Sequence, residues 1–232
     1  MNKVHFKNLG KLDYKECWDL QEEVFKGIVD QKIFNRNFPD QTVKTENHLF
    51  FVEHPHVFTL GKSGDEAHLL LNQEALIANG ATYHKINRGG DITYHGPGQL
   101  VAYPIFDLDH FFTDIHKYLR YLEEAIILTI ADYGIEGGRI DGLTGVWIES
   151  ENEEKARKIA ALGVKCSRWV TMHGLALNVN SDLDFFNMIV PCGIDDKAVT
   201  SIEKEVGEKV DYQEVQDKML VNLQNVFDFD LA

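Results

Sequence analysis

The chain has 232 residues, of which 44% are hydrophobic and 26% are charged, and its formal net charge is −14. This length allows one large domain or two small ones with a sizeable core, and the acidic balance argues against a nucleic-acid-binding protein. No stretch approaches the roughly 18 apolar residues of a membrane-spanning helix. The N-terminus lacks a signal-peptide pattern and the three cysteines do not form a disulfide framework, so we expect a cytoplasmic protein.

Hydrophobic spacing predicts the secondary structure of the first half of the chain. Apolar residues recur at helical intervals between residues 13 and 30, which indicates an amphipathic helix. Further on, the pattern predicts strands over residues 49–53, 57–60 and 100–106 and a helix over residues 113–133. Pro104 favours a strand end or a bulge, and Thr113 or Asp114 is the expected cap of the second helix.

The second half of the chain repeats this mixture of strands and helices. The expected elements are a hairpin over residues 145–149 and 158–162, a strand over 172–179, and helices over 182–189 and 212–227. Because strands form clusters between helices without steady alternation, we predict an α+β fold with a mixed sheet. The stretch over residues 201–232 reads as a small C-terminal helical extension, although no linker precedes it.

The densest chemical signal is the segment from Arg88 to Gln99, which contains four glycines. Glycine permits positive φ and close backbone approach, so this composition favours a loop that lies against a ligand, with Arg88 and His95 supplying charge and donors. The alternative is a tight turn between strands in which His95 is structural. The glycine spacing matches neither a Walker phosphate loop nor a dinucleotide fingerprint.

Lys158 is a candidate general base. In a strand it shares one face with Ala160 and Leu162, and burial of that face would lower the pKa of its amine and make it a usable base. The alternative is a solvated lysine at a sheet edge whose stem packs on the sheet.

Cys192 is the cysteine with the most loop-like setting, between Pro191 and Gly193. Functional residues concentrate on loops, whereas a lone cysteine is more often a small buried hydrophobe. Cys17 falls in the first predicted helix, and Cys166 in a strand remains the competing nucleophile. The pair His54 and His56 has no accompanying cysteine or carboxylate cluster, so we predict no metal site.

Four segments together resemble the octanoyltransferases of lipoate biosynthesis, also called lipoyl(octanoyl) transferases. In order, they are Arg88–Gln99, Lys158–Gly163, His173–Asn178 and Pro191–Gly193. The resemblance runs from about Phe50 to Ser201. It implies the fold of the biotin and lipoate protein ligases, in a single catalytic domain over residues 1–232 with an acyl-binding core over about residues 45–200.

The resemblance also implies roles for individual residues. Cys192 and Lys158 correspond to the catalytic pair of the family. The residues that match its acyl-binding segments are Arg88, Gly89, Gly90, Asp91, Ile92, Thr93, Tyr94, His95, Ala161, Leu162, Gly163, Gly174, Leu175 and Ala176. At the positions of Asp91 and Tyr94 the family tolerates other side chains. Residues 151–155 lengthen the hairpin before Lys158.

The implied reaction moves an octanoyl group from octanoyl-acyl carrier protein to a lysine through a thioester on Cys192. A Lys158 ammonium would favour the Cys192 thiolate, and neutral Lys158 would accept a proton from the incoming amine. Because the acyl group arrives activated, no cofactor, nucleotide or metal is expected. The implied acceptors are lipoyl domains of 2-oxoacid dehydrogenase E2 subunits and the glycine cleavage H protein.

Acidic partners and an acidic enzyme should repel each other, so we expect a local basic rim from Arg88, Lys85, Arg157, Lys165 and Arg168. Two other functions remain open at this point. An ATP-dependent lipoate or biotin ligase would share the fold but would need no cysteine, and a non-catalytic acyl-binding module would need neither Cys192 nor Lys158.

Overall fold

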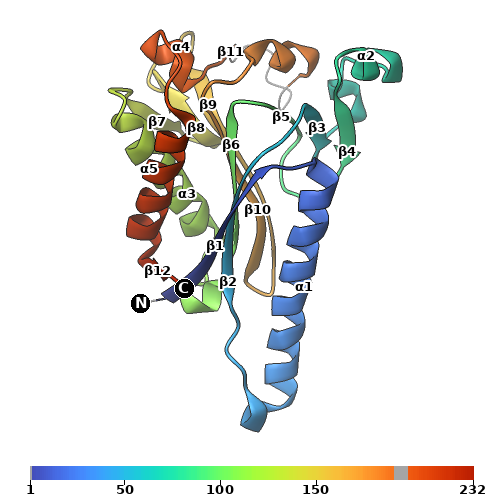
Figure 1. The fold of residues 1–232 in the computed structure, drawn as a ribbon, viewed down its shortest axis with the longest axis vertical. Coiled ribbons are helices and arrows are strands. Elements are labelled where there is room, and N and C mark those ends of the chain that lie inside the picture. The colour runs from blue at the N-terminus through green and yellow to red at the C-terminus, as the bar shows by residue number, and fades with distance from the viewer. Residues whose placement is uncertain (1, 191–197) are drawn as a thin grey trace.

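Two β-sheets organise the fold in the computed structural model, which describes residues 2–190 and 198–232 (Figure 1). The described strands are β1 Asn2–Lys11, β2 Asn47–Glu53, β3 Val57–Leu60, β4 Thr82–Lys85, β5 Ile92–His95, β6 Gln99–Ile105, β7 Gly137–Ile140, β8 Leu143–Ile148, β9 Arg157–Ser167, β10 Val170–Asn178, β11 Ala198–Val199 and β12 Phe229–Leu231. The larger sheet has the order β12-β1-β2-β6-β10-β9-β8-β7, with β11 paired to β9, and the smaller has the order β4-β3-β5. Both parallel and antiparallel pairs occur in each sheet, which confirms the predicted mixed-sheet α+β class.

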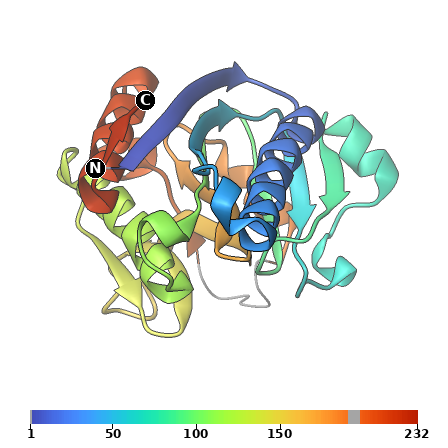
Figure 2. The same cartoon turned by 90° about the horizontal axis from the view of Figure 1, so that it is seen from below.

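Helices cover both faces of the larger sheet (Figure 2). The helix α1, Tyr14–Asn37, packs on one face, and the helices α3, Ile115–Ala131, and α5, Tyr212–Phe227, pack on the other. The shorter helices are α2, Gln73–Ala78, and α4, Ile202–Val206. Each long helix begins after an aspartate whose side chain accepts hydrogen bonds from the first-turn backbone amides, which satisfies otherwise unpaired donors.

Most predicted elements are confirmed, and three differ. The helix α1 continues to Asn37 instead of ending near residue 30, and residues 183–188 form a 3-10 helix, η4, instead of an α-helix. The predicted loop over residues 88–99 is wrong in its middle, because β5 pairs there with β3. The strand β1 was not expected, since Val4 is its one fully buried side chain and its alternation is weak.

The C-terminal stretch adds to both the helical layer and the sheet. Val215, Met219, Leu223 and Phe227 of α5 are buried in the same apolar cluster as α3. The strand β12 pairs in parallel with β1 and extends the larger sheet. Residues 201–232 therefore share their core with the rest of the chain.

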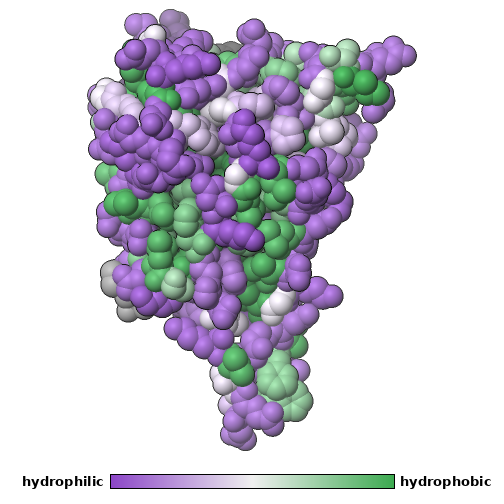
Figure 3. Space-filling view, viewed as in Figure 1, coloured by the Kyte–Doolittle hydropathy of each residue, from purple (hydrophilic) through white to green (hydrophobic). Residues whose placement is uncertain are grey.

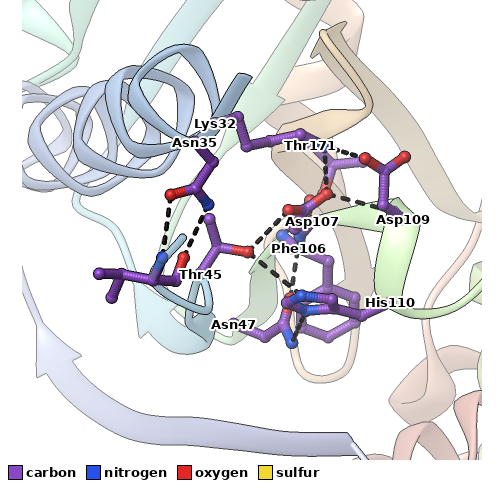
Figure 4. Close-up of polar contacts among 10 residues, drawn as sticks. Lys32, Asn35, Thr45, Asn47, Phe106, Asp107, Asp109, His110 and Thr171 are labelled. Carbon is purple, nitrogen blue, oxygen red and sulfur yellow. Dashed lines mark hydrogen bonds and ion pairs between the residues drawn. The ribbon is translucent and has the colours of Figure 1, made fainter. Parts of the chain in front are cut away.

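A buried polar cluster ties the far end of α1 to the end of β6 (Figure 4). Asp107 is almost fully buried and pairs with Lys32 of α1, which also lies 2.7 Å from the carboxylate of Asp109. The hydroxyl of Thr45 donates to Asp107 at 2.7 Å, and the side-chain oxygen of Asn47 accepts from the Asp107 amide at 2.9 Å. Because a buried carboxylate is stable only when paired, this cluster fixes the position of α1 over the sheet.

Beyond this cluster, the end of α1 and the 3-10 helix Pro39–Gln41 project past the sheet and carry apolar surface at their tip (Figure 3). The exposed apolar residues of this region are Phe34, Phe38 and Val43, and the two phenyl rings pack with centroids 4.9 Å apart. Among the described residues, no helix combines the length and apolar character needed to cross a membrane.

Candidate active site

A cavity of about 530 Å³ lies where β9 and β10 of the larger sheet meet the segment that leads into β5. This volume falls within the range of small-molecule sites. The lining residues include thirteen of the fourteen predicted binding residues, namely Arg88, Gly89, Gly90, Asp91, Ile92, Thr93, His95, Ala161, Leu162, Gly163, Gly174, Leu175 and Ala176. Segments that lie far apart in the sequence therefore share one cavity.

Arg88 stabilises the wall of this cavity through buried hydrogen bonds. Its guanidinium is buried and donates to the Thr59 carbonyl at 2.6 Å, to the Thr59 hydroxyl at 3.0 Å and to the Gly89 carbonyl at 2.9 Å. The Gly89 amide in turn donates to the Val164 carbonyl of β9 at 2.9 Å. These contacts join the two sheets through the 88–90 segment and fix the cavity wall between them.

Gly163 allows this segment to approach β9. A Cβ atom at Gly163 would lie 3.0 Å from both the Gly89 carbonyl oxygen and the Arg88 Cδ atom. Those neighbours are tied into the sheet and cannot easily move aside. A larger residue at position 163 would therefore crowd the contact between these two chain segments, which favours glycine there.

Tyr94 and Asp91 have different surroundings, although both were predicted to bind substrate. Tyr94 does not line the cavity: its hydroxyl bonds to the His56 Nδ1 atom at 2.7 Å, and its ring stacks on Phe185. Neighbouring residues of a strand point to opposite faces, so Thr93 and His95 line the cavity while Tyr94 faces away. Asp91 lines the cavity and bonds to the His68 Nδ1 atom at 2.6 Å.

Lys158 lines the cavity and is half-buried. Its Nζ atom lies 4.6 Å from the centroid of the Trp147 ring, within the range of a cation–π contact. The other predicted catalytic residue, Cys192, lies outside the described residues. The described chain resumes at β11, where Val199 pairs with Lys158.

Three histidines and two tyrosines form a buried polar region next to the apolar part of the cavity. Burial lowers the pKa of His95 and of His173 to about 3 and that of His54 to about 4. Their imidazoles are therefore neutral at pH 7. The nearby Arg88 guanidinium also disfavours charge on His173, as a secondary cause. Burial raises the pKa of Tyr14 and of Tyr103.

His173 combines two costly features. Its backbone adopts φ of 62°, which is uncommon for a residue other than glycine, and neither ring nitrogen has a hydrogen-bond partner among the described residues. Such features cluster at functional sites. Sequence reasoning missed His173, Tyr14 and Tyr103 as lining residues. His173 adjoins the predicted Gly174, whereas nothing in the sequence near the tyrosines points to the cavity.

The other two cysteines do not line the cavity. Cys17 is buried in α1, and burial raises the pKa of its thiol to about 12. Cys166 is exposed on β9, and partial desolvation raises the pKa of its thiol as well. A raised thiol pKa disfavours the nucleophilic thiolate, so the structure does not support Cys166 as the competing nucleophile.

The expected basic rim is wrong for four of its five residues. Arg88 is buried inside the protein. Three more of these residues each form an ion pair with a carboxylate, namely Lys85 with Glu66 at 2.9 Å, Arg157 with Glu205 at 2.5 Å and Lys165 with Glu22 at 3.1 Å. Their charges are therefore balanced locally. In residues 2–190 and 198–232, no group of three or more His, Cys, Asp or Glu side chains is arranged to hold a metal ion.

Comparison with known proteins adds independent information. The family model of the lipoyl protein ligase A/B catalytic domain matches residues 13–224. An octanoyltransferase from Cytophaga hutchinsonii is 62% identical over 226 residues, which cover 97% of this chain and 93% of that protein. An octanoyltransferase from Flavobacterium johnsoniae is 58% identical over 231 residues, which cover 99% of both proteins.

Solved structures agree with the fold. A bipartite lipoate protein ligase from Thermoplasma acidophilum superposes with a TM-score of 0.69 and 16% identity, over 100% of this chain and 86% of that one. A lipoate-protein ligase A bound with ATP superposes with a TM-score of 0.67 and 17% identity, over 100% of this chain and 87% of that one. At these identities the likeness defines the fold alone.

Proposed function

Because this chain belongs to the lipoyl protein ligase A/B catalytic domain family and closely resembles octanoyltransferases over nearly its whole length, we propose that Cys192 and Lys158 carry its octanoyl transfer. The protein is an acyltransferase that acts in protein lipoylation, with lipoyl-domain proteins as acceptors. We further propose octanoyl-acyl carrier protein as the donor. The specific acceptors would be the lipoyl domains of 2-oxoacid dehydrogenase E2 subunits and the glycine cleavage H protein, in the cytoplasm.

The cavity supports this proposal because its lining suits a medium-length apolar chain. Ala161, Leu162, Leu175 and Ala176 contribute apolar walls from β9 and β10. Lys158 lines the same cavity and stands on β9 three residues before Ala161, at one end of this strand's contribution to the lining. An acyl chain in the cavity would therefore present its carbonyl carbon towards the Lys158 end.

The proposed chemistry proceeds in two balanced steps. In the first, the Cys192 thiolate attacks the carbonyl carbon of the donor thioester, and the carrier thiolate leaves with a proton from the Lys158 ammonium. In the second, the amine of the acceptor lysine attacks the Cys192 thioester and loses a proton to neutral Lys158. The Cys192 thiolate then leaves and is again stabilised by the Lys158 ammonium.

The position of β11 supports the pairing of these two residues. Val199 pairs with Lys158 and follows Cys192 by seven residues, and the Thr200 amide donates to the Lys158 carbonyl at 2.9 Å. Val199 also lines the cavity, so the described chain that follows Cys192 in sequence begins at the cavity wall, which supports a role for Cys192 at this site. This anchoring next to Lys158 is the observation that carries the proposal.

Intact-mass measurement tests the proposed intermediate. Incubation with octanoyl-acyl carrier protein should add one octanoyl group that hydroxylamine removes, and peptide mapping should place it on Cys192. Cys192→Ser should lose both the adduct and octanoyl transfer to an apo lipoyl domain, while its thermal unfolding stays unchanged. An adduct on Cys166 with full activity of Cys192→Ser would refute the assignment.

A further inference from the structure

Glu123 is a fully buried carboxylate on the mostly apolar buried face of α3. Charged side chains are almost never fully buried unless they are paired, because desolvation of a charge is costly. One oxygen of Glu123 accepts from Arg139 Nε at 3.0 Å and lies 3.1 Å from Arg120 Nη1. The other oxygen accepts from the backbone amide of Gly145 at 3.0 Å. Glu123 therefore joins a charge pair to one peptide group of β8.

That peptide group lies against the side chain of Lys158. A Cβ atom at Gly145 would be 3.2 Å from Lys158 Cε and 2.8 Å from the Ala160 carbonyl oxygen, and Gly145 has φ of 130°. On the same strand, the Trp147 ring faces the Lys158 amine at 4.6 Å. The β8–β9 pairing shifts register between Val146 and Trp147, and such bulges re-aim side chains. Gly145 thus lies beside the stem of Lys158, and the Trp147 ring faces its amine.

The same elements form the cavity wall next to Lys158. Leu119 lies one helical turn before Glu123 on α3 and lines the cavity, as do Gly142, Leu143 and Thr144, which lead into Gly145. The bond from Glu123 to Gly145 is therefore a link between α3 and this wall. If it is lost, the wall and the Lys158 stem lose a common support.

We propose that Glu123 is a positioning residue for Lys158, acting through the Gly145 amide. This inference rests on the proposed role of Lys158 in octanoyl transfer. Glu123 does not line the cavity, so it would act without contact to the substrate. Misplacement of a reacting group by about 1 Å costs on the order of 10²-fold in rate, so a displaced Lys158 should lower kcat far more than it raises KM.

The chain offers a matched control on the same helix. Glu124 also pairs with Arg139, at 2.7 Å, but it is 43% exposed, and the Gly145 amide donates to Glu123 instead. Glu124→Gln therefore weakens the same arginine pair and should leave kcat unchanged. Glu123→Leu removes the acceptor for the Gly145 amide, whereas Glu123→Gln retains an oxygen acceptor without the charge.

Two readouts test the proposal. Reductive methylation with ¹³C-formaldehyde labels lysines for NMR, and the Lys158 signal is the one that Lys158→Ala lacks. We expect Glu123→Leu to move this signal and to lower kcat by about 10- to 100-fold, with KM within about twofold. Glu123→Gln should restore part of kcat, and Glu124→Gln should match the wild type in both readouts.

Several results would overturn the inference. An unchanged Lys158 signal in folded Glu123→Leu would do so, and so would an equal loss of kcat in Glu124→Gln. If Glu123→Leu does not fold, Gly145→Ala displaces Lys158 from the other side and should move its signal, and an unmoved signal refutes the contact. Failure of the proposed function looks different, because Lys158→Ala would then transfer octanoate at the wild-type rate.

Discussion

The buried histidines should make the stability of this protein depend steeply on pH. His54, His95 and His173 have folded-state pKa values lowered to about 4, 3 and 3 from an ordinary 6.5. At pH values between 6.5 and these lowered pKa values, the unfolded chain therefore binds more protons than the folded chain. The stabilisation from each neutral histidine is complete above pH 6.5 and is lost as the pH falls towards the folded pKa.

The size of this loss follows from the shifts. Between pH 7 and pH 5, an unfolded histidine gains most of a proton while these folded ones gain almost none, which costs about 2 kcal/mol for each. All three together should lower the free energy of unfolding by about 6 kcal/mol, comparable to the total stability of many domains. Guanidinium unfolding followed by tryptophan fluorescence at pH 7, 6 and 5 measures this difference.

A variant isolates the contribution of one histidine. His173→Gln cannot titrate, so its loss of stability between pH 7 and pH 5 should be smaller than that of the wild type by about 2 kcal/mol. The carboxylates titrate in both proteins and cancel in the comparison. His116→Gln, at an exposed position on α3, is the control and should keep the wild-type pH dependence. The same pH dependence in His173→Gln and in the wild type would refute the reasoning.

Three further outcomes follow from the structure and the proposed function. Lys158→Ala should slow iodoacetamide alkylation of Cys192 and shift its pH profile to higher pH, and wild-type rates from about pH 6 to 9 would contradict this. Lys158→Arg should allow acyl-enzyme formation but block transfer to the acceptor, because a guanidinium cannot accept the proton. Octanoyl transfer from the carrier thioester should run fully without ATP and magnesium, and a strict need for ATP with free octanoate would instead indicate a ligase. Asp107→Ala removes the buried partner of Lys32 and should lower the free energy of unfolding by about 3 kcal/mol, which calorimetry would show as a Tm lower by about 6–12 °C. As a control, loss of the exposed pair in Lys3→Ala should cost under about 1 kcal/mol.

Much of the local structure could be predicted from the sequence. The helix α5 has the predicted bounds, and α3 begins after Asp114, one of the two expected caps. Helical periodicity and capping are encoded within a window of a few turns, so they can be read without knowledge of the fold. The order of the four motifs likewise indicated the family, which the comparisons confirm.

The cavity and its supports were decided only by the tertiary structure. Tyr94 was placed in the binding loop but turns to His56, because β5 is a strand whose alternate residues face opposite sides. Sequence reasoning gave Glu123 no role, since its link to Gly145 spans 22 positions and depends on how α3 packs on β8. The sequence by itself determined the long helices, several central strands and the motifs that these segments carry. The pairing of distant strands, and the close approach that Gly163 permits, exist only after folding, because they depend on contacts between segments that no local window contains.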